Sequence, residues 1–387
     1  MDKNKKLITI FISSFRSGGG EKMMVELAGA LAHRGHRVDL VVMKNEGPLL
    51  SQVDPLVRVV DLKVGRIIFS PLNLKDYLIL NNPDVVMSLD EYTHLVSLLS
   101  KRLAGSRVRI VLRVGNMYSE LFRRYGKIRD RFLIPILVRK FYKQADKIIA
   151  VSNGVADDIT SVADLDKKKV VVVYNPKSES FISKKTAEPV GHSWVERKSD
   201  LLIVAVGRLR EQKNFSFLIK SFNRVRAQIN CRLIIVGAGR EEERLRELTR
   251  DLKCEDYVSL PGYTDNPYRY LAKADVFVSA SLWEGMPNGV LEAITCGAPA
   301  VVSDCDSGPR EILAPDTDYR LRLDKGFEMA DFGILCAVGD EDGLVQAILK
   351  ILKDDGLRQA YSLASRKRAK DFDFDLIISK YEGVLVN

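Results

Sequence analysis

Two glutamates, Glu284 and Glu292, flank a proline directly after a short apolar segment of strand type, Asp275 to Ser281. Pro287 is favourable at the first position of a helix, and Gly297 is favourable just after its end. The unpaired backbone N–H groups of such a helix point beyond the strand end, where a diphosphate suits them. One carboxylate can then reach a sugar and the other a ribose. The pattern therefore indicates a site for a nucleotide sugar.

A second candidate element lies upstream and carries cations. The apolar run Leu201 to Val206 predicts a strand, followed by a loop that contains Arg208 and Lys213 and then by a helical period that includes Phe217 and Leu218. Arginine offers a planar fork of donors and lysine a compact charge, so together they can neutralise a departing pyrophosphate. This strand, loop and helix therefore predict an anion site.

A third element stands near the start of the chain. The strand candidate Leu7 to Ser13 leads to Gly18-Gly19-Gly20, where the backbone can approach a ligand closely, and then to a helix. Asp39 follows about twenty residues on, which is typical of a dinucleotide site. However, that pattern would need a third glycine at Met23, so the dinucleotide interpretation fails. A plain tight turn is an equally good interpretation of the three glycines.

Together these elements resemble the retaining glycosyltransferases of family 4, which have the GT-B fold. The resemblance rests on Glu284-Gly285-Met286-Pro287-Asn288 with Leu291-Glu292-Ala293, and on Gly207-Arg208-Leu209 with Lys213-Asn214. It implies that Glu284 contacts the hexose and Glu292 the ribose, and that Arg208 and Lys213 hold the diphosphate. The implied catalytic residues are Glu284, Arg208 and Lys213. The other residues expected at the donor are Gly18, Gly19, Gly20, Gly207, Gly285, Met286, Pro287, Asn288, Gly289 and Glu292.

Two further motifs resemble one branch of that family. Residues 307–312, Ser-Gly-Pro-Arg-Glu-Ile, and Gly262-Tyr263 with Asn266-Pro267 are similar to enzymes that extend polyprenyl-diphosphate-linked oligosaccharides, such as N-acetylgalactosaminyltransferases. The resemblance implies transfer of a hexose or N-acetylhexosamine from a UDP-sugar with retention, by front-face attack and without a cofactor or metal ion. A UDP-sugar 2-epimerase of GT-B fold and a non-catalytic GT-B-like scaffold remain as alternatives.

One loop departs from the family pattern. Many relatives carry a histidine where this chain has Gly115, within Arg113-Val114-Gly115-Asn116. Arg113, Asn116 and His94 are therefore candidate contacts for the acceptor or the sugar. His94 follows Asp90-Glu91 at a predicted helix start, where a histidine more often has a structural role.

The length and the alternation of strands with helices predict two domains. The chain has 387 residues, which favours two doubly wound parallel sheets, and in the GT-B plan these face a cleft. We expect an N-terminal acceptor- and membrane-facing domain (1–177), a polar linker (178–200), a C-terminal nucleotide-sugar-binding domain (201–370) and a last helix that crosses back to the first domain (371–387). Besides the three strands above, we expect Arg37–Met43, Val57–Asp61, Asp84–Ser88, Arg109–Val114, Lys147–Val151, Val170–Tyr174, Cys231–Val236, Val258–Leu260 and Ala300–Ser303.

Positive charge is concentrated in the first half of the chain. The net charge is +13 over residues 1–199 and −4 over residues 200–387, against +9 for the whole. Cations, aromatics and aliphatics alternate in residues 122–147, which is typical of a segment that lies on an anionic membrane. An ordinary helix with a solvated basic face explains the composition equally well. No nucleic-acid reader motif accompanies the charge, so nucleic acid is not an expected partner.

The remaining composition favours a cytoplasmic enzyme at the inner face of the cell membrane. The number of cysteines is five and none forms a C-x-x-C pair, so disulfides are not expected. None of the four histidines has metal-ligand spacing. The sequence has no signal-peptide pattern, and no apolar run approaches the roughly 20 residues of a spanning helix.

Overall fold

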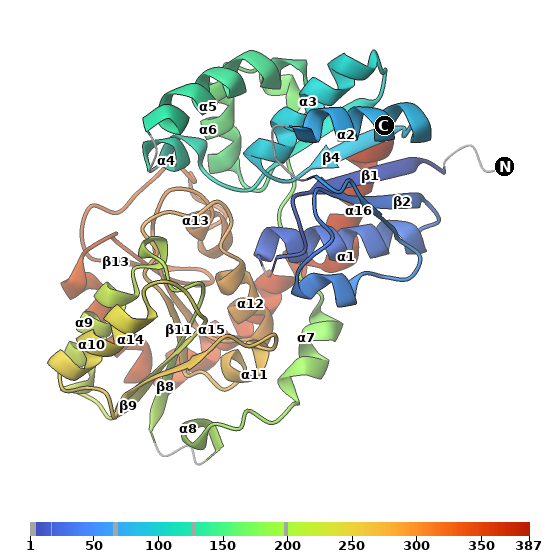
Figure 1. Cartoon of the computed structure of the whole chain (residues 1–387). Coiled ribbons are helices and arrows are strands. Elements are labelled where there is room, and N and C mark those ends of the chain that lie inside the picture. The colour runs from blue at the N-terminus through green and yellow to red at the C-terminus, as the bar shows by residue number, and fades with distance from the viewer. Residues whose placement is uncertain (1–4, 17, 65–68, 125–127, 197–199) are drawn as a thin grey trace. The chain divides into compact units, whose positions relative to one another are not determined.

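The computed structural model of the chain describes residues 5–16, 18–64, 69–124, 128–196 and 200–387, without the side chains of residues 128–130 (Figure 1). It divides into two compact units. The first unit ends at Pro176 and also includes Asp375–Asn387, and the second unit is Lys177–Phe374. Each has its own sheet with helices on both faces, as the alternation of strands and helices in the sequence predicts.

The first sheet is wholly parallel and has the strand order β3-β2-β1-β4-β5-β6-β7. Its central strands are continuous apolar runs and are buried on both faces, because helices cover each side of a doubly wound sheet. The strands are β1 Leu7–Ile12, β2 Arg37–Val42, β3 Arg58–Asp61, β4 Val85–Ser88, β5 Arg109–Val114, β6 Lys147–Ala150 and β7 Val170–Val172.

The helices of the first unit begin and end at residues suited to those positions. Asp90 caps α3 in a capping box with Thr93, and Gly105 ends that helix in the left-handed conformation. Asp39 lies within β2 rather than at its end, where it accepts hydrogen bonds from the side chains of Arg58 and Tyr77. The helices are α1 Gly19–His33, α2 Ser70–Asn81, α3 Glu91–Ala104, α4 Tyr118–Arg123, α5 Ile128–Phe141, α6 Asn153–Ala163 and α16 Phe374–Val386.

The second sheet has the order β10-β9-β8-β11-β12-β14-β13 and is parallel except at one edge. The edge strand β13 runs antiparallel to β14, a hairpin that the prediction of an all-parallel sheet missed. Every predicted strand occurs, and each observed end lies within two residues of the predicted one. The strands are β8 Leu201–Val206, β9 Cys231–Val236, β10 Val258–Gly262, β11 Val276–Ser279, β12 Ala300–Ser303, β13 Phe327–Ala330 and β14 Gly333–Cys336.

The described part of the predicted linker 178–200, residues 178–196 and 200, belongs to the second unit. Their two short helices are held by polar contacts: Asn266 Nδ2 donates to the carbonyl of Lys185 at 2.9 Å, and His192 Nε2 lies 3.0 Å from Ser259 Oγ. The polar composition that suggests a linker comes from the solvent-exposed side of this segment. The helices of this unit are α7 Glu179–Thr186, α8 Ser193–Glu196, α9 Phe215–Arg226, α10 Glu242–Asp251, α11 Tyr268–Leu271, α12 Asn288–Cys296, α13 Pro309–Leu313, α14 Glu341–Leu352 and α15 Asp355–Ala369.

The last helix, α16, belongs to the first unit, where Figure 1 shows it in red beside α1 and β2. Glu382 accepts hydrogen bonds from Arg34 Nη1 at 2.7 Å and pairs with His36 Nε2 at 2.9 Å. Leu376 lies on the exposed side of this helix. The side chains that it buries are Ile377, Ile378, Tyr381 and Leu385.

Candidate active site

Three loops that carry predicted site residues follow neighbouring strands of the second sheet. These strands, β8, β11 and β12, lie side by side and run parallel, so their carboxyl ends meet at one edge. Ligands of such sheets bind beyond this edge. Sheet order therefore brings together segments that are separated by about a hundred residues in the sequence.

Gly207 opens the loop after β8 and allows Lys213 to fold back across it. A Cβ atom at Gly207 would lie only 3.2 Å from Lys213 Cε. Leu209 anchors this loop, because its side chain is fully buried and its N–H donates to the carbonyl of Ala238 at 3.0 Å. A larger residue at position 207 would push the ammonium group away from the strand end.

Lys213 and Glu284 form an ion pair, with 2.5 Å between Nζ and Oε1. Glu284 is 6% exposed, so the carboxylate is almost wholly shielded from water. Gln212 joins the same two loops, because its Nε2 donates to the carbonyl of Trp283 and its own carbonyl accepts from the N–H of Leu282, each at 2.9 Å. The sequence predicts ligand contacts for both Lys213 and Glu284 but does not predict that they pair with each other.

Arg208 extends into solvent from the same loop. In the described part of the chain its guanidinium group forms no ion pair, and neither do those of its neighbours Arg210 and Arg240. The charge of Arg208 lowers the pKa of Arg210, and burial and Arg240 lower it further. Three cations thus share one region without bound carboxylates, which makes it attractive to an anion.

The helix after the Glu284 loop begins one residue later than predicted. Pro287 caps α12 in an extended conformation (ψ 99°) instead of occupying its first turn, and its carbonyl accepts the N–H groups of Val290 and Leu291. The start of this helix packs on β8, since a Cβ atom at Gly289 would lie 3.2 Å from the carbonyl oxygen of Val206. The helix amides therefore lie beside the end of β8.

The loop after β12 shapes the Glu284 loop. Ser307 Oγ donates to the carbonyl of Gly285 at 2.7 Å, and the N–H of Glu284 reaches the carbonyl of Asp306 at 3.4 Å. Gly308 adopts φ +91°, and a Cβ atom there would lie 2.6 Å from Pro287 Cδ. Only glycine allows this approach.

Arg310 anchors that loop through a buried charge network, which sequence reasoning did not find. Its Nη2 lies 2.6 Å from Asp304 Oδ2 and 2.9 Å from Glu328 Oε2, and the side chains of Arg310 and Asp304 are almost fully buried. Arg368 supports the same region by donating to the carbonyls of Glu311 and Ile312. The sequence singled out the motif around Arg310 but offered no signal for its partners.

Glu292 lies on α12, where its Oε1 pairs with Lys177 Nζ at 3.3 Å. Gly18, Gly19 and Gly20 are in the first unit at the start of α1, which follows β1. Gly18 is the residue before the helix, and the carboxylate of Glu21 lies over it, since a Cβ atom there would overlap Glu21 Oε2. Met23, Met24, Leu27 and Leu31 are buried and belong to the apolar face of α1.

The three candidate acceptor contacts occupy different environments. Arg113 is buried and structural: its Nε donates to Tyr381 Oη at 3.1 Å and its Nη2 to Asn175 Oδ1 at 2.6 Å. Asn116 is exposed. His94 is fully buried, so it is placed in the core rather than on a surface that could meet an acceptor.

Both ring nitrogens of His94 are engaged. Nδ1 lies 2.8 Å from Tyr142 Oη and 3.1 Å from Tyr118 Oη, and Nε2 lies 3.1 Å from the carbonyl of Ser88. A neutral ring fits these contacts if Nε2–H donates and Nδ1 accepts. Burial, the largest cause, lowers the pKa of His94 to about 4.

This buried histidine predicts a loss of stability in mild acid. Its pKa is about 6.5 in an unfolded chain, so between pH 6.5 and 4 the unfolded state binds a proton that the folded state does not. The free energy of unfolding should therefore fall by about 2 kcal/mol between pH 7 and pH 5 on account of this residue alone. Urea unfolding of the native protein and of His94→Gln at both pH values measures it. Equal falls in the two proteins would contradict the prediction.

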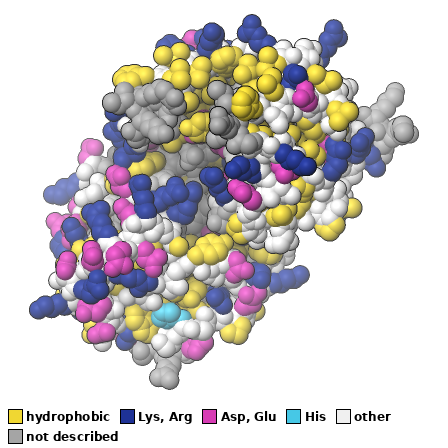
Figure 2. Space-filling model, viewed as in Figure 1, with side chains coloured by type: hydrophobic (Ala, Val, Ile, Leu, Met, Phe, Trp, Pro, Cys, Tyr) yellow, Lys and Arg dark blue, Asp and Glu magenta, His cyan; other side chains and the backbone are white. Residues whose placement is uncertain are grey.

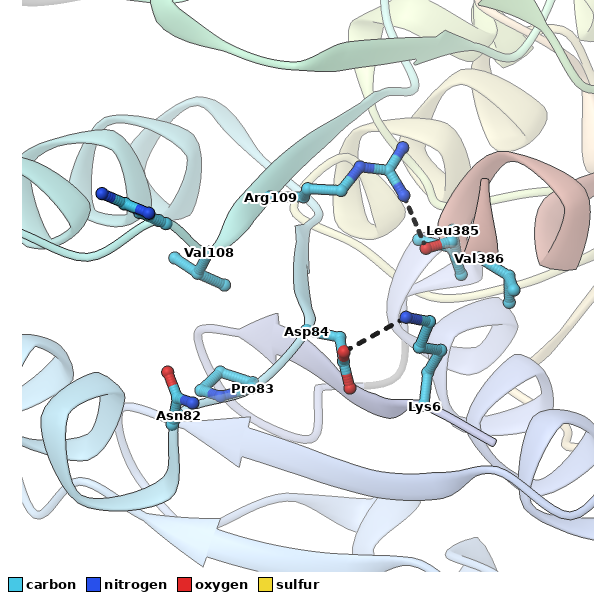
Figure 3. Close-up of a pocket in the computed structure, with 9 residues that line it drawn as sticks. Lys6, Asn82, Pro83, Asp84, Val108, Arg109, Leu385 and Val386 are labelled. Atoms are coloured by element: carbon cyan, nitrogen blue, oxygen red, sulfur yellow. Dashed lines mark hydrogen bonds and ion pairs between the residues drawn. The ribbon is translucent and has the colours of Figure 1, made fainter. Parts of the chain in front are cut away.

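A cavity of about 320 Å³ lies elsewhere in the first unit (Figure 3). It is bordered by the residues that precede or begin β1, β4 and β5 and by the end of α16. Lys6 pairs with Asp84 at 3.3 Å, and Arg109 Nη1 donates to the carbonyl of Leu385 at 3.0 Å. Since it lies at the amino ends of the strands, opposite the edge that binds ligands in such sheets, it is not the candidate active site.

The described residues contain neither a metal-ligand cluster nor a membrane-spanning helix. Within the ranges given above, no group of three or more His, Cys, Asp or Glu side chains is arranged to hold a metal ion. In the same ranges, no helix combines the length and the hydropathy needed to span a membrane.

Comparison with known proteins identifies the class to which this fold and site belong. Residues 17–177 match the family model described as Glycosyltransferase Family 4, and residues 191–368 match that described as Glycosyl transferases group 1. The chain belongs to these glycosyltransferases. The fold is GT-B: the structure of Anabaena HepE in complex with UDP and glucose matches 98% of this chain and 99% of its own at a TM-score of 0.79, with 17% identity.

Two relatives are similar over most of their length. The chain is 29% identical to N-acetylgalactosamine-N,N'-diacetylbacillosaminyl-diphospho-undecaprenol 4-alpha-N-acetylgalactosaminyltransferase of Campylobacter jejuni, over 94% of this chain and 95% of the relative. It is 32% identical to an uncharacterized glycosyltransferase of Methanocaldococcus jannaschii, over 88% of this chain and 85% of the relative.

Proposed function

We propose that this protein transfers a hexose or N-acetylhexosamine from a UDP-sugar to a polyprenyl-diphosphate-linked saccharide, with retention of the anomeric configuration. One observation carries the proposal: Arg208, the Lys213–Glu284 pair and the first amides of α12 gather at the carboxyl ends of β8 and β11. The Campylobacter relative, named as a transferase that acts on an undecaprenol-linked diphospho-saccharide, supports the acceptor class. The UDP and glucose bound to HepE support the donor class.

In this proposal the positive groups act on the leaving diphosphate. Departure of the UDP group leaves a sugar that resembles an oxocarbenium ion, while negative charge grows on the β-phosphate. Arg208 and Lys213 would stabilise that charge together with the amides at the start of α12. Glu284, already paired with Lys213, would accept hydrogen bonds from the sugar hydroxyls, and the developing phosphate charge would share the same ammonium group.

Retention would follow from attack on the face from which the diphosphate leaves. The leaving phosphate oxygen would accept the proton of the attacking hydroxyl, so neither a dedicated base nor a divalent metal ion is needed. Two cations and a helix terminus supply the positive charge that a metal would otherwise provide. We therefore propose a metal-independent transferase without a cofactor, in which the UDP-sugar is a co-substrate.

Release of UDP tests the proposal. The protein is incubated with single UDP-sugars, with and without a polyprenyl-diphosphate saccharide and in the presence of EDTA. We expect release that depends on the acceptor and persists in EDTA, and an α-linked product from an α-linked donor. Formation of an epimer without acceptor would favour a 2-epimerase, and no turnover with any donor would favour a scaffold. Loss of activity in EDTA would contradict the metal-independent mechanism.

We further propose that α5 places the enzyme on the cytoplasmic face of the cell membrane. This helix exposes three apolar side chains, Phe132 at 66%, Leu133 at 44% and Ile136 at 63%. The exposed cations Arg131, Arg139 and Lys140 are on the same helix, and Figure 2 shows hydrophobic and basic side chains together over the upper helices of this unit. Residues 125–127 of the predicted basic segment lie outside the described residues. Apolar side chains beside cations suit the headgroup region of an anionic bilayer.

Removing two of these apolar side chains should weaken membrane binding. Burying a Phe or Ile side chain contributes about 1.5–3 kcal/mol, so Phe132→Ser with Ile136→Ser should lower affinity for phosphatidylglycerol vesicles at least about tenfold. Co-sedimentation with vesicles measures the affinity. Leu363→Ser is the matched control, because Leu363 is 71% exposed on the second unit. Equal binding by the double variant and the control would refute a membrane role for α5.

A further inference from the structure

Lys177 is the first residue of the second unit and lies where the chain passes between units. Its N–H donates to the carbonyl of Phe372 at 2.7 Å, and it forms an isolated parallel bridge with Asp373. The chain enters the second unit at Lys177 and leaves it after Phe374. The backbone of Lys177 is therefore fixed against the segment by which the chain leaves.

The side chain of Lys177 reaches from this point to Glu292. Nζ lies 3.3 Å from Glu292 Oε1, and the two side chains are only 14% and 16% exposed. Among the described residues, Lys177 is the single ion-pair partner of Glu292. An ammonium group at this distance attracts the carboxylate and restrains its orientation.

The pair leaves the carboxylate able to bind a diol. A carboxylate has about four acceptor positions on its two oxygens, and Lys177 occupies one position on Oε1. Glu292 itself is on the second turn of α12, whose neighbouring residues Leu291 and Ala293 are buried. With the helix fixed by packing and the side chain fixed by the ammonium group, Oε2 has a defined position.

We propose that Lys177 is a positioning residue for the ribose of the donor: it holds the Glu292 carboxylate in an orientation that accepts hydrogen bonds from the ribose hydroxyls. This inference rests on the proposed function and on the ribose contact that the family resemblance implies for Glu292. Lys177 is not part of the sequence motifs that define the donor site. It is the residue at which the chain enters the second unit. Lys177 acts through Glu292 and does not contact the reacting atoms.

The test compares two nucleotides on each protein. Dissociation constants of UDP and 2′,3′-dideoxy-UDP are measured by calorimetry, and their ratio isolates the ribose hydroxyls from any general damage to the site. The native protein should prefer UDP by about tenfold or more, as expected for hydrogen bonds to a charged group. Lys177→Gln and Lys177→Met should reduce this ratio at least about threefold, and Lys177→Arg should restore part of it. Lys184→Gln, an exposed lysine on α7, should keep the native ratio.

The outcomes separate the inference from its premise. A ratio near one in the native protein, or an unchanged ratio in Glu292→Gln, would overturn the ribose role of Glu292 and the inference with it. A native ratio in both Lys177→Gln and Lys177→Met, with a reduced ratio in Glu292→Gln, would overturn the inference alone. In the double variant Lys177→Gln/Glu292→Gln we expect the ratio of Glu292→Gln, because the two residues act as one unit.

Discussion

Arg208→Ala is expected to lower kcat by about 10²- to 10³-fold, the usual effect of removing one preorganised charge-stabilising donor from a transition state. The affinity for the UDP-sugar should fall much less, because the negative charge on the diphosphate grows as the bond to the sugar breaks. Folding should be unaffected, since the guanidinium group is exposed and forms no ion pair among the described residues. Steady-state rates of UDP release together with the melting temperature measure both effects.

Two further variants show whether the effect is particular to Arg208: Lys213→Ala removes the other cation of the site, and Arg250→Ala is an exposed control. Lys213 also neutralises the buried Glu284, so its loss should reduce stability as well as rate. Arg250 is 60% exposed on α10 and should alter neither. Near-native kcat in Arg208→Ala, with saturating donor, would show that this guanidinium does not stabilise the leaving diphosphate.

The second large effect is expected on stability. Arg310→Ala would leave Asp304 buried without its cation, and breaking a buried ion pair in this way costs about 3–5 kcal/mol. The free energy of unfolding from urea titration measures the loss. Because the loop that Arg310 holds also fixes Ser307 against Gly285, residual folded protein should bind UDP-sugar more weakly.

Two comparisons control this prediction. Arg320→Ala removes an arginine whose side chain is 60% exposed and should change the free energy of unfolding by less than about 0.5 kcal/mol. Arg310→Ala combined with Asp304→Asn should recover part of the loss, because the uncompensated charge is removed. A loss in Arg310→Ala no larger than that in Arg320→Ala would show that the network does not stabilise the loop.

The sheets and the loops of the active site could be predicted because their signals are local. Continuous apolar runs such as Leu201 to Val206 can be satisfied only between two layers of helices, and a parallel sheet then brings its loops to one edge. The pairing of Lys213 with Glu284 could not be predicted in the same way. It depends on β8 lying next to β11, and the order of strands in a sheet is decided by packing of the whole unit.

The errors also have physical causes. The β13–β14 hairpin escaped prediction because its two strands have only four residues each and Phe327–Ala330 is also partly polar. Arg113 carries a charged group that is typical of surfaces, yet a partner distant in the sequence satisfies it in the core. For Arg113 that partner, Tyr381, is more than 250 residues away. Local sequence contains no information about such partners.

The position of α16 has a consequence for the order in which the protein matures on the ribosome. The first unit is discontinuous, since its core requires Tyr381 and Leu385 from the end of the chain, whereas the second unit is a single stretch, Lys177–Phe374. Domains generally fold as units during synthesis. The second unit can thus finish folding first, whereas the first unit cannot complete its core until α16 has been translated.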